Sequence, residues 1–477
     1  MNTRFLRRAV CVLATFIMSA VAAFADGSTP VPLSQWGTAT HPDASVGALL
    51  GGDTAWTLTS TALVLLMTPG LAFFYGGMVR SKNVLSVLMQ SFVACGLITV
   101  QWVIYGYSLA FGPDFHHFVG NLDWVFLHHV SAYRGYFPYG NTVPHQIYCM
   151  FQLMFAIITP ALISGSIVER MKFKAYLWFM LLWATFIYDP LAHMVWGQGG
   201  LLGTNGPAGA AGALDFAGGS VVHMSSGYSA LTLAIILGRR RRSEGGDELR
   251  PHNLPMTAIG TALLWFGWFG FNSGSAISAG QLATSAFVAT HVATGTAALT
   301  WMFLDWLIYK KPTALGFCSG AVAGLVAITP ACGFVNPVGS LWIGLIVSCI
   351  CFFAIKIKHA LKADDALDVF GVHGIGGTWG SISTGLFASL AINSGAHNGL
   401  LMGGSFTTSI VPQLKDIGLT VFMSVFGTII IANVVKLICG GLRAPDEAEE
   451  VGLDLADHGE VGYSGESAGV PAYATLD

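Results

Sequence analysis

Long apolar segments separated by short polar connections dominate the chain from about residue 53 onward. Most of them run for about 20 residues or more, the length that an α-helix needs to cross the hydrocarbon core of a bilayer. The pattern therefore predicts an all-α polytopic membrane protein with eleven transmembrane helices. Their approximate ranges are 55–79, 84–111, 144–168, 174–196, 218–238, 255–276, 284–308, 313–332, 337–356, 372–392 and 417–437.

The composition agrees with this class and disfavours others. Hydrophobic residues make up 53% of the chain and charged residues only 10%, with a mean hydropathy of +0.63. Soluble domains carry about 25% charged residues. The 59 glycines suit close packing of helices in lipid. A net charge of −3 argues against a nucleic-acid partner.

The eight cysteines show no spacing typical of a zinc site. Seven of them lie in apolar runs, where a small buried side chain is the simplest interpretation. Cys332 is the exception and is expected to face outward. We therefore expect neither a bound metal nor another cofactor.

The first 25 residues are typical of a signal peptide. Arg4, Arg7 and Arg8 precede a short apolar run, which ends in the small-residue pattern Ala23-Phe24-Ala25. A twelfth membrane span is the alternative, but the run is short and small residues end it. Residues 26–52 are polar and contain glycine and proline, so they are expected to form an exported tail.

The basic residues indicate the orientation of the helices. Cytoplasmic loops carry the excess of lysine and arginine in membrane proteins. Only Arg134 and Lys415 fall in the opposite set of loops. The alternation places the mature N-terminus outside and the C-terminus in the cytoplasm, as cleavage after residue 25 requires. The basic groups of the inner loops are Arg80 and Lys82; Arg170, Lys172 and Lys174; Arg239–Arg242 and Arg250; Lys310 and Lys311; and Lys356, Lys358 and Lys362.

Eleven helices divide into five, five and one. An odd number of helices in each half means that the second half is inserted upside down relative to the first, an architecture in which the binding site lies at the repeat interface. The halves cover about 53–242 and 251–396, and the last helix covers about 415–441.

Two histidines occupy matching places in these halves. His223 lies in the fifth segment of the first half, and His373 lies in the fifth segment of the second. A histidine within a membrane segment is costly without a partner and commonly marks a functional site. We expect the two side chains to meet near the repeat axis. The alternative is that each one packs between helices and bonds to a backbone carbonyl.

Several ordered motifs resemble the ammonium transporter family (the Amt/Mep/Rh group), and its bacterial Amt branch in particular. The resemblance runs from about residue 53 to 463. It rests on Phe73-Phe74-Tyr75-Gly76-Gly77, Ala192-His193-Met194-Val195-Trp196-Gly197, Gly212-Ala213-Leu214-Asp215-Phe216-Ala217-Gly218-Gly219, Gly267-Trp268-Phe269-Gly270-Phe271-Asn272 and Asp368-Val369-Phe370-Gly371-Val372-His373-Gly374.

The resemblance implies a homotrimer with one pore in each subunit and a role for each of seven side chains. Trp196 and Ser275 would form an outer ammonium site. Below it, Phe155 and Phe271 would gate the pore, and the two histidines would line the lumen. Asp215, which is also suited to cap a helix, would support the outer site.

Two further aromatic residues are expected to support the path to the histidines. Phe151 lies four positions before Phe155, on the same face of a helix, and Trp268 lies near the outer end of the sixth segment. The alternative is that each belongs to a belt of aromatic residues at the membrane interface.

The expected function is ammonium transport. Ammonium would bind outside and lose its proton, and ammonia, with or without that proton, would pass into the cytoplasm across the inner (plasma) membrane. The alternatives are an ammonium sensor of the same fold and a Rhesus-type channel for neutral gases. An enzyme is not expected, because Gly374-Ile-Gly376-Gly377 lacks the strand and turn of a dinucleotide site.

Residues 443–477 are acidic, and composition alone favours a disordered tail. Their resemblance to the family implies instead a cytoplasmic regulatory region and a signalling protein of the PII type as a partner at that face. The loop at 112–143 is long, is expected to be exported and carries several histidines. Metal binding there is an alternative, but a solvated loop is the simpler interpretation.

Overall fold

The computed structural model describes residues 49–136, 138–241, 249–360 and 363–463. The expected signal peptide 1–25 and nearly all of the tail 26–52 lie outside these ranges. So do residues 464–477 of the C-terminal region.

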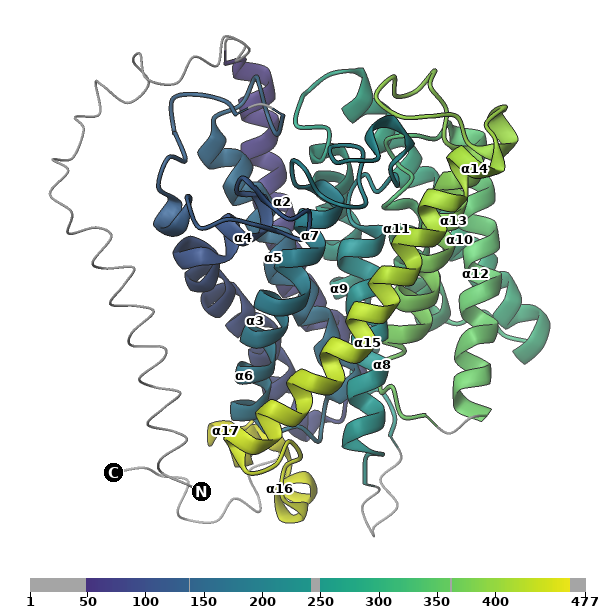
Figure 1. Ribbon diagram of the computed structural model, residues 1–477. Helices are drawn as coiled ribbons and strands as arrows, with labels where there is room; N and C mark the ends of the chain where they lie inside the picture. The colour runs from purple at the N-terminus through teal and green to yellow at the C-terminus, as the bar shows by residue number, and fades with distance from the viewer. Residues whose placement is uncertain (1–48, 137, 242–248, 361–362, 464–477) are drawn as a thin grey trace, which may run out of the picture.

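Long helices lie side by side and form one bundle, with the long α15 crossing its face in Figure 1. Several helices run on through π-helical turns, which often occur at functional sites. The helices of the bundle are α2 (Gly51–Met78), α3 (Val84–Gln101) with η3 (Trp102–Gly106) and α4 (Tyr107–Phe111), α5 (His145–Ile167), α6 (Phe173–Trp183) with η5 (Ala184–Tyr188) and α7 (Asp189–Trp196), η7 (Gly219–Met224) with α8 (Ser225–Leu237), α9 (Leu254–Trp268) with η8 (Phe269–Ser273), α10 (Gln281–Tyr309), α11 (Ala314–Ile328), α12 (Pro337–Ala360), η9 (Phe370–Gly374) with α13 (Ile375–Phe387), and α15 (Val411–Cys439).

The prediction of an all-α polytopic membrane protein is confirmed. Within the described residues, nine helices are long and apolar enough to cross a membrane, and α11 is a shorter apolar helix. Each of the eleven expected ranges coincides with helical residues. The number of membrane crossings and the orientation of the termini stay predictions. Cys332 is fully buried, so the expectation that it faces outward is wrong.

Glycines allow the helices that carry the two histidines to touch. A Cβ atom on Gly227 of α8 would lie 2.1 Å from the backbone nitrogen of Gly374. A Cβ atom on Gly377 of α13 would lie 3.1 Å from the Cβ atom of His223. Each glycine follows a histidine by one helical turn. Small residues at these crossings let the backbones approach closely.

The connection at 112–143 is folded over one end of the bundle. It contains the short antiparallel strands β1 (Asp114–Phe115) and β2 (Val119–Gly120) and the turn η4 (Val125–Leu127). Asp114 contacts the buried His193 of α7 through an Oδ1 to Nε2 distance of 3.0 Å. In the described part of the chain, no group of three His, Cys, Asp or Glu residues could hold a metal ion.

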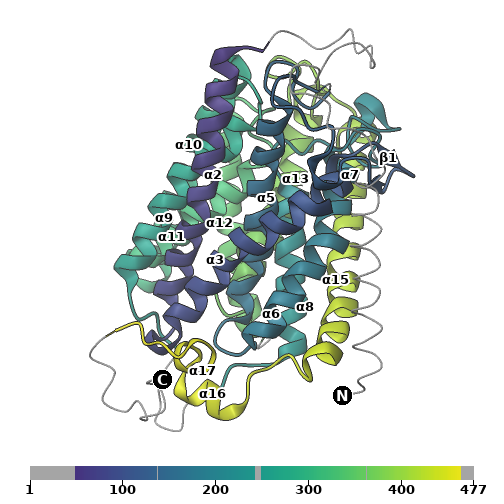
Figure 2. The same cartoon turned by 90° about the vertical axis from the view of Figure 1, so that its left-hand side faces the viewer.

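The described part of the C-terminal region packs against the opposite end of the bundle. It forms α16 (Asp446–Val451) and α17 (Leu453–His458), which lie below α3 and α6 in Figure 2. The Asp454 carboxylate accepts hydrogen bonds from the backbone nitrogens of Leu85 and Ser86, at 3.0 and 2.7 Å. These donors begin α3, where a negative charge is stabilising. A disordered tail is therefore wrong for residues 443–463.

Buried ion pairs join the loops at this end. Arg170 is fully buried and lies 3.6 Å from Asp364, and Arg240 donates to Asp364 at 2.9 Å. Burial acts to raise the pKa of Asp364, but the hydrogen bonds and positive charge of Arg240, with the charge of Arg170, outweigh it and lower that pKa to about 2. The cluster therefore fastens the connection before η9 to the ends of α5 and α8.

We expect Asp364→Asn to destabilise the protein by roughly 3 kcal/mol at neutral pH, because it removes the carboxylate beside the buried Arg170 and leaves Arg240 with the more distant carboxylate of Glu169, at 3.7 Å. The pKa is lower in the folded than in the unfolded protein, where it is about 3.9. The stabilisation is therefore complete above about pH 4 and disappears as the pH falls toward about 2. Thermal unfolding in detergent across this range measures the difference.

The matched control is Asp446→Asn, since Asp446 pairs with Arg241 at 2.7 Å and both side chains are 57% exposed. Exposed pairs contribute about 0–1 kcal/mol. Equal melting temperatures for the two variants at neutral pH would contradict a stabilising role for the buried cluster.

Candidate functional site

The structure brings together the two histidines that the sequence singles out. The Nδ1 atoms of His223 in η7 and His373 in η9 lie 3.3 Å apart, and the ring centroids are 5.3 Å apart. Both side chains are at least 96% buried, with exposed fractions of 1% and 4%. Two buried imidazoles at this distance share one hydrogen bond, so one ring donates and the other accepts.

A threonine contacts the other side of the His223 ring. The Thr329 hydroxyl donates to the Leu325 carbonyl at 2.8 Å and accepts from the Trp268 indole at 2.9 Å. Its oxygen also lies 3.3 Å from Nε2 of His223. The His223 ring is therefore held at both nitrogens, by Thr329 at Nε2 and by His373 at Nδ1.

Aromatic rings continue from this pair toward the outer site that the resemblance implies. Phe155 stacks on Phe271 with centroids 4.2 Å apart, and Phe271 lies 6.1 Å from the ring of His223. On the other side, Phe155 lies 6.1 Å from Trp196 at an interplanar angle of 87°. Phe151 packs edge-on against Phe155 at 5.0 Å. The rings from Trp196 to His373 thus form one unbroken row.

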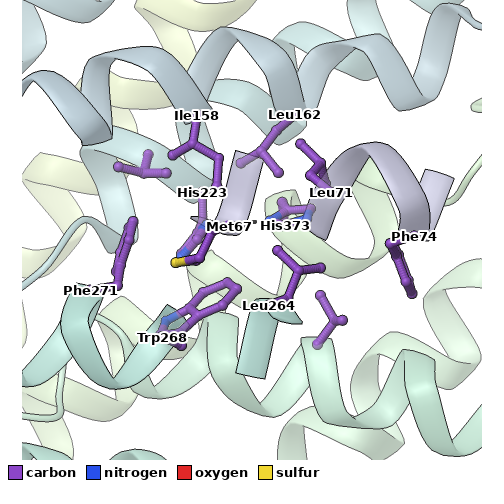
Figure 3. A pocket seen from close by; sticks show the side chains of 12 residues that line it. Met67, Leu71, Phe74, Ile158, Leu162, His223, Leu264, Trp268, Phe271 and His373 are labelled. Carbon is purple, nitrogen blue, oxygen red and sulfur yellow. Dashed lines mark hydrogen bonds between the residues drawn. The ribbon is translucent and has the colours of Figure 1, made fainter. Parts of the chain in front are cut away.

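A narrow cavity lies along the histidines. Figure 3 shows Phe271 at one end, Phe74 at the other and the two histidines between them. The space holds little more than one water-sized molecule at a time. Its lining is apolar except for the histidines and Trp268, so a charged occupant would find few partners. The lining residues are Met67, Leu71, Phe74, Ile158, Leu162, Val222, His223, Leu264, Trp268, Phe271, Val322 and His373.

Trp196 and Asp215 are joined beyond the stacked phenylalanines. The Trp196 indole donates to the Asp215 carbonyl at 2.9 Å. The Trp196 ring is half-buried. The Asp215 carboxylate accepts from the backbone nitrogens of Gly218 and Gly219, both at 2.7 Å, and from the Ser220 hydroxyl at 2.8 Å. The side chain therefore caps the helix that carries His223.

Ser275 lies one turn beyond Phe271. Its hydroxyl donates to the Phe271 carbonyl at 2.8 Å, so its oxygen is able to accept a hydrogen bond from a ligand. The described residues show no hydrogen bond or ring contact between Ser275 and Trp196. Contacts of Trp196 with Phe155 and of Phe155 with Phe271 connect the two sides of the expected outer site.

A sequence model of the Ammonium Transporter Family matches residues 55–463. This range covers the whole row of rings and both histidines. The chain belongs to the Ammonium Transporter Family.

Bacterial relatives agree with this membership. The chain is 48% identical to an ammonium transporter of Bacillus subtilis over 413 residues, which cover 86% of this chain and 98% of that protein. It is 46% identical to an ammonium transporter of Mycobacterium tuberculosis over 433 residues, which cover 87% and 90%.

Solved structures share the fold. Mep2 of Saccharomyces cerevisiae superposes with a TM-score of 0.75 at 33% identity, covering 83% of this chain and 91% of Mep2. A structure described as a sensor Amt protein superposes with a TM-score of 0.75 at 26% identity, covering 85% of this chain and 98% of that chain.

The sequence contained a signal for one site residue that we did not predict. Asp365 precedes His373 by eight residues, as Asp215 precedes His223. Asp365 is buried and accepts from the Ser166 hydroxyl and from the backbone nitrogens of Val369 and Phe370, the latter two at 3.1 and 2.8 Å. Each histidine of the pair therefore follows an aspartate cap. The sequence around Thr329 gave no comparable indication of a role, because this residue simply follows the apolar helix α11.

We expect Thr329→Val to reduce ammonium flux roughly tenfold without changing the fold, because it leaves the Trp268 indole and His223 Nε2 without a partner, at a cost of about 1–3 kcal/mol. Flux into liposomes from purified protein measures the effect. Thr428→Val is the control, since the buried hydroxyl of Thr428 has no hydrogen-bond partner in the part of the chain that the structure describes. Unchanged flux in Thr329→Val would contradict its role in orienting the histidines.

Proposed function

We propose that this protein transports ammonium into the cytoplasm. Ammonium is recruited at Trp196 and Ser275, loses its proton above the stacked rings of Phe155 and Phe271, and crosses as ammonia along His223 and His373. The observation that carries the proposal is the pair of hydrogen-bonded histidines inside a narrow apolar cavity, at the end of a row of rings that starts at Trp196.

The outer site suits a small cation with hydrogen-bond donors. The half-buried Trp196 ring offers a π-face to a cation, and the Ser275 oxygen accepts a hydrogen bond. Asp215 supplies negative charge nearby, but its carboxylate is already occupied by backbone and serine donors. It therefore supports the site by shaping it and by its charge, not by direct coordination.

The pore favours a neutral molecule. The stacked phenylalanines and the apolar lining offer no replacement for the hydration shell of a cation, so an intact ion meets a barrier of many kcal/mol there. Potassium has a similar size to ammonium but has no proton to lose. Removal of the proton before the cavity therefore provides selectivity between the two ions.

The histidine pair suits ammonia as its occupant. A neutral imidazole has one acceptor nitrogen and one donor nitrogen, so the pair is able to bond to ammonia, and the hydrogen bond between His223 and His373 holds both rings in place. A linked pair of imidazoles is also able to carry a proton separately from ammonia. Both net transport of ammonia and charge-coupled transport of ammonium are compatible with this geometry.

The outer surface of the bundle supports a position within a membrane. Large apolar side chains such as Leu307, Leu437 and Trp306 are more than half exposed, as lipid or neighbouring subunits require. We place the protein in the inner (plasma) membrane as a homotrimer, with its N-terminus outside and its C-terminus inside. The docked α16 and α17 provide a surface at the cytoplasmic end for a signalling protein of the PII type.

A sensor of the same fold is the second candidate, because the sensor Amt protein shares the architecture at a TM-score of 0.75. Flux distinguishes it from a transporter. A Rhesus-type channel for neutral gases is disfavoured by the cation site that Trp196 and Ser275 would form.

The decisive variants are His373→Ala and His223→Ala, measured by solid-supported-membrane current after an ammonium pulse on proteoliposomes. We expect wild-type protein to give a saturable inward current. Each variant should change the size of this current roughly tenfold, because each leaves its partner imidazole unpaired in an apolar site. His291→Ala is the control, since His291 is exposed and its ring packs at a tilt against Trp265, which is not among the residues that line the cavity.

The other outcomes separate the candidates. A rapid rise of internal pH without current would show net conduction of ammonia. Binding of ammonium without flux of either kind would favour the sensor. Currents in both histidine variants equal to that of wild-type protein would overturn the assignment of the pore.

A further inference from the structure

An aspartate outside the row of rings has no adequate partner. Asp416, near the start of α15, is fully buried, and its Oδ2 atom has no hydrogen-bond partner among the described residues. Its Oδ1 atom lies 3.5 Å from the Thr420 hydroxyl, which is a weak contact. An ionised carboxylate with so few donors is very costly in a dry environment, so its burial requires an explanation.

Asp416 lies beside the aspartate that caps the pore helix. α15 packs against η7, and among the described residues Asp215 is the titratable group whose charge acts on Asp416. Ser220 faces both carboxyl groups, but its hydroxyl hydrogen bond goes to Oδ2 of Asp215 at 2.8 Å. The neighbouring Lys415 on α15 is exposed, and Cys332 is buried near Asp215.

The arrangement is held in place one turn away. Gln413 of α15 accepts from the Leu214 nitrogen at 2.7 Å and donates to the Leu214 carbonyl at 2.9 Å. The same amide donates to the Ser381 carbonyl at 3.1 Å. α15 is thus bonded to the residue before Asp215 and to α13, and the two carboxyl groups have little freedom to move apart.

The two carboxyl groups have unequal surroundings. Asp215 receives three backbone donors at 2.7 to 2.9 Å and the Ser220 hydroxyl, whereas no backbone group among the described residues donates to Asp416, and its one hydrogen bond there is the long contact with Thr420. Donors favour the ionised form, and a neighbouring carboxylate disfavours a second negative charge. The pair therefore holds one proton, and this proton resides on Asp416.

We propose that Asp416 is a positioning residue whose protonation sets the affinity of the outer site for ammonium. This inference rests on the proposed transport function. When Asp416 is protonated, Asp215 and Asp416 together carry one negative charge near Trp196. When Asp416 has lost its proton, they carry two. The second charge holds a cation more tightly, and, by reciprocity, a bound cation favours loss of the proton from Asp416.

The test compares Asp416→Asn with wild-type protein in proteoliposomes at several external pH values at which ammonium remains protonated. In wild-type protein, the half-saturating ammonium concentration should fall by about fivefold or more as the pH rises. A fivefold change in affinity is the lower end of the coupling that is typical between two linked sites. Asp416→Asn cannot lose a proton and should give a flat profile. Asp416→Glu should restore the slope.

Asp305→Asn is the matched control, because Asp305 is a buried aspartate of α10 bonded to Thr313. It should keep the wild-type slope. A slope in Asp416→Asn equal to that of wild-type protein would overturn the inference.

Infrared difference spectroscopy of purified protein provides a readout that does not depend on transport. Wild-type protein should show the carbonyl band of a protonated carboxylic acid that weakens when ammonium is added, and Asp416→Asn should lack it. An identical band in Asp416→Asn would overturn the inference even where transport is normal. A wild-type protein that shows the band but no flux would instead contradict the proposed function alone.

Discussion

The contact between two imidazoles in an apolar cavity is the interaction on which the rest of the structure depends. Nδ1 of His223 and Nδ1 of His373 approach to 3.3 Å, and both side chains are almost completely buried. Such a pair requires helices that cross closely and neighbours that hold the rings in place. Gly227 and Gly377 provide the crossing, and Thr329 provides the partner for His223.

Two aspartate caps extend this constraint to the starts of both helices that carry the histidines. Asp215 and Asp365 each precede a histidine of the pair by eight residues and each accept backbone donors at the start of a π-helical turn. The caps fix where each helix begins and therefore where each imidazole lies. Asp215 also lies beside Trp196 and Asp416, so this cap links the expected ammonium site to the helix that carries His223.

Much of the fold could be predicted from the sequence, because apolar segments of membrane length leave few alternatives to helices. The matched places of His223 and His373 in two halves also indicated that they meet. Family motifs suggested Phe155, Phe271 and Trp196, which the structure places in one row of rings.

Partners that depend on how a helix is rotated could not be predicted. Thr329 and Asp416 lie in apolar segments, where spacing along the chain does not show which neighbour a side chain faces. The burial of Cys332 and the packing of residues 443–463 against α3 were missed for a similar reason. A loop position or an acidic composition suggests exposure unless the contacts across the fold are known.

The central claim is that a cation does not cross the histidine cavity intact. The most direct measurement compares potassium and ammonium pulses at equal concentrations on the same wild-type proteoliposomes, with protein-free liposomes as the baseline. We predict a saturable current after the ammonium pulse and a current equal to the baseline after the potassium pulse. A potassium current similar to the ammonium current would show that intact cations pass, and it would contradict proton removal as the basis of selectivity.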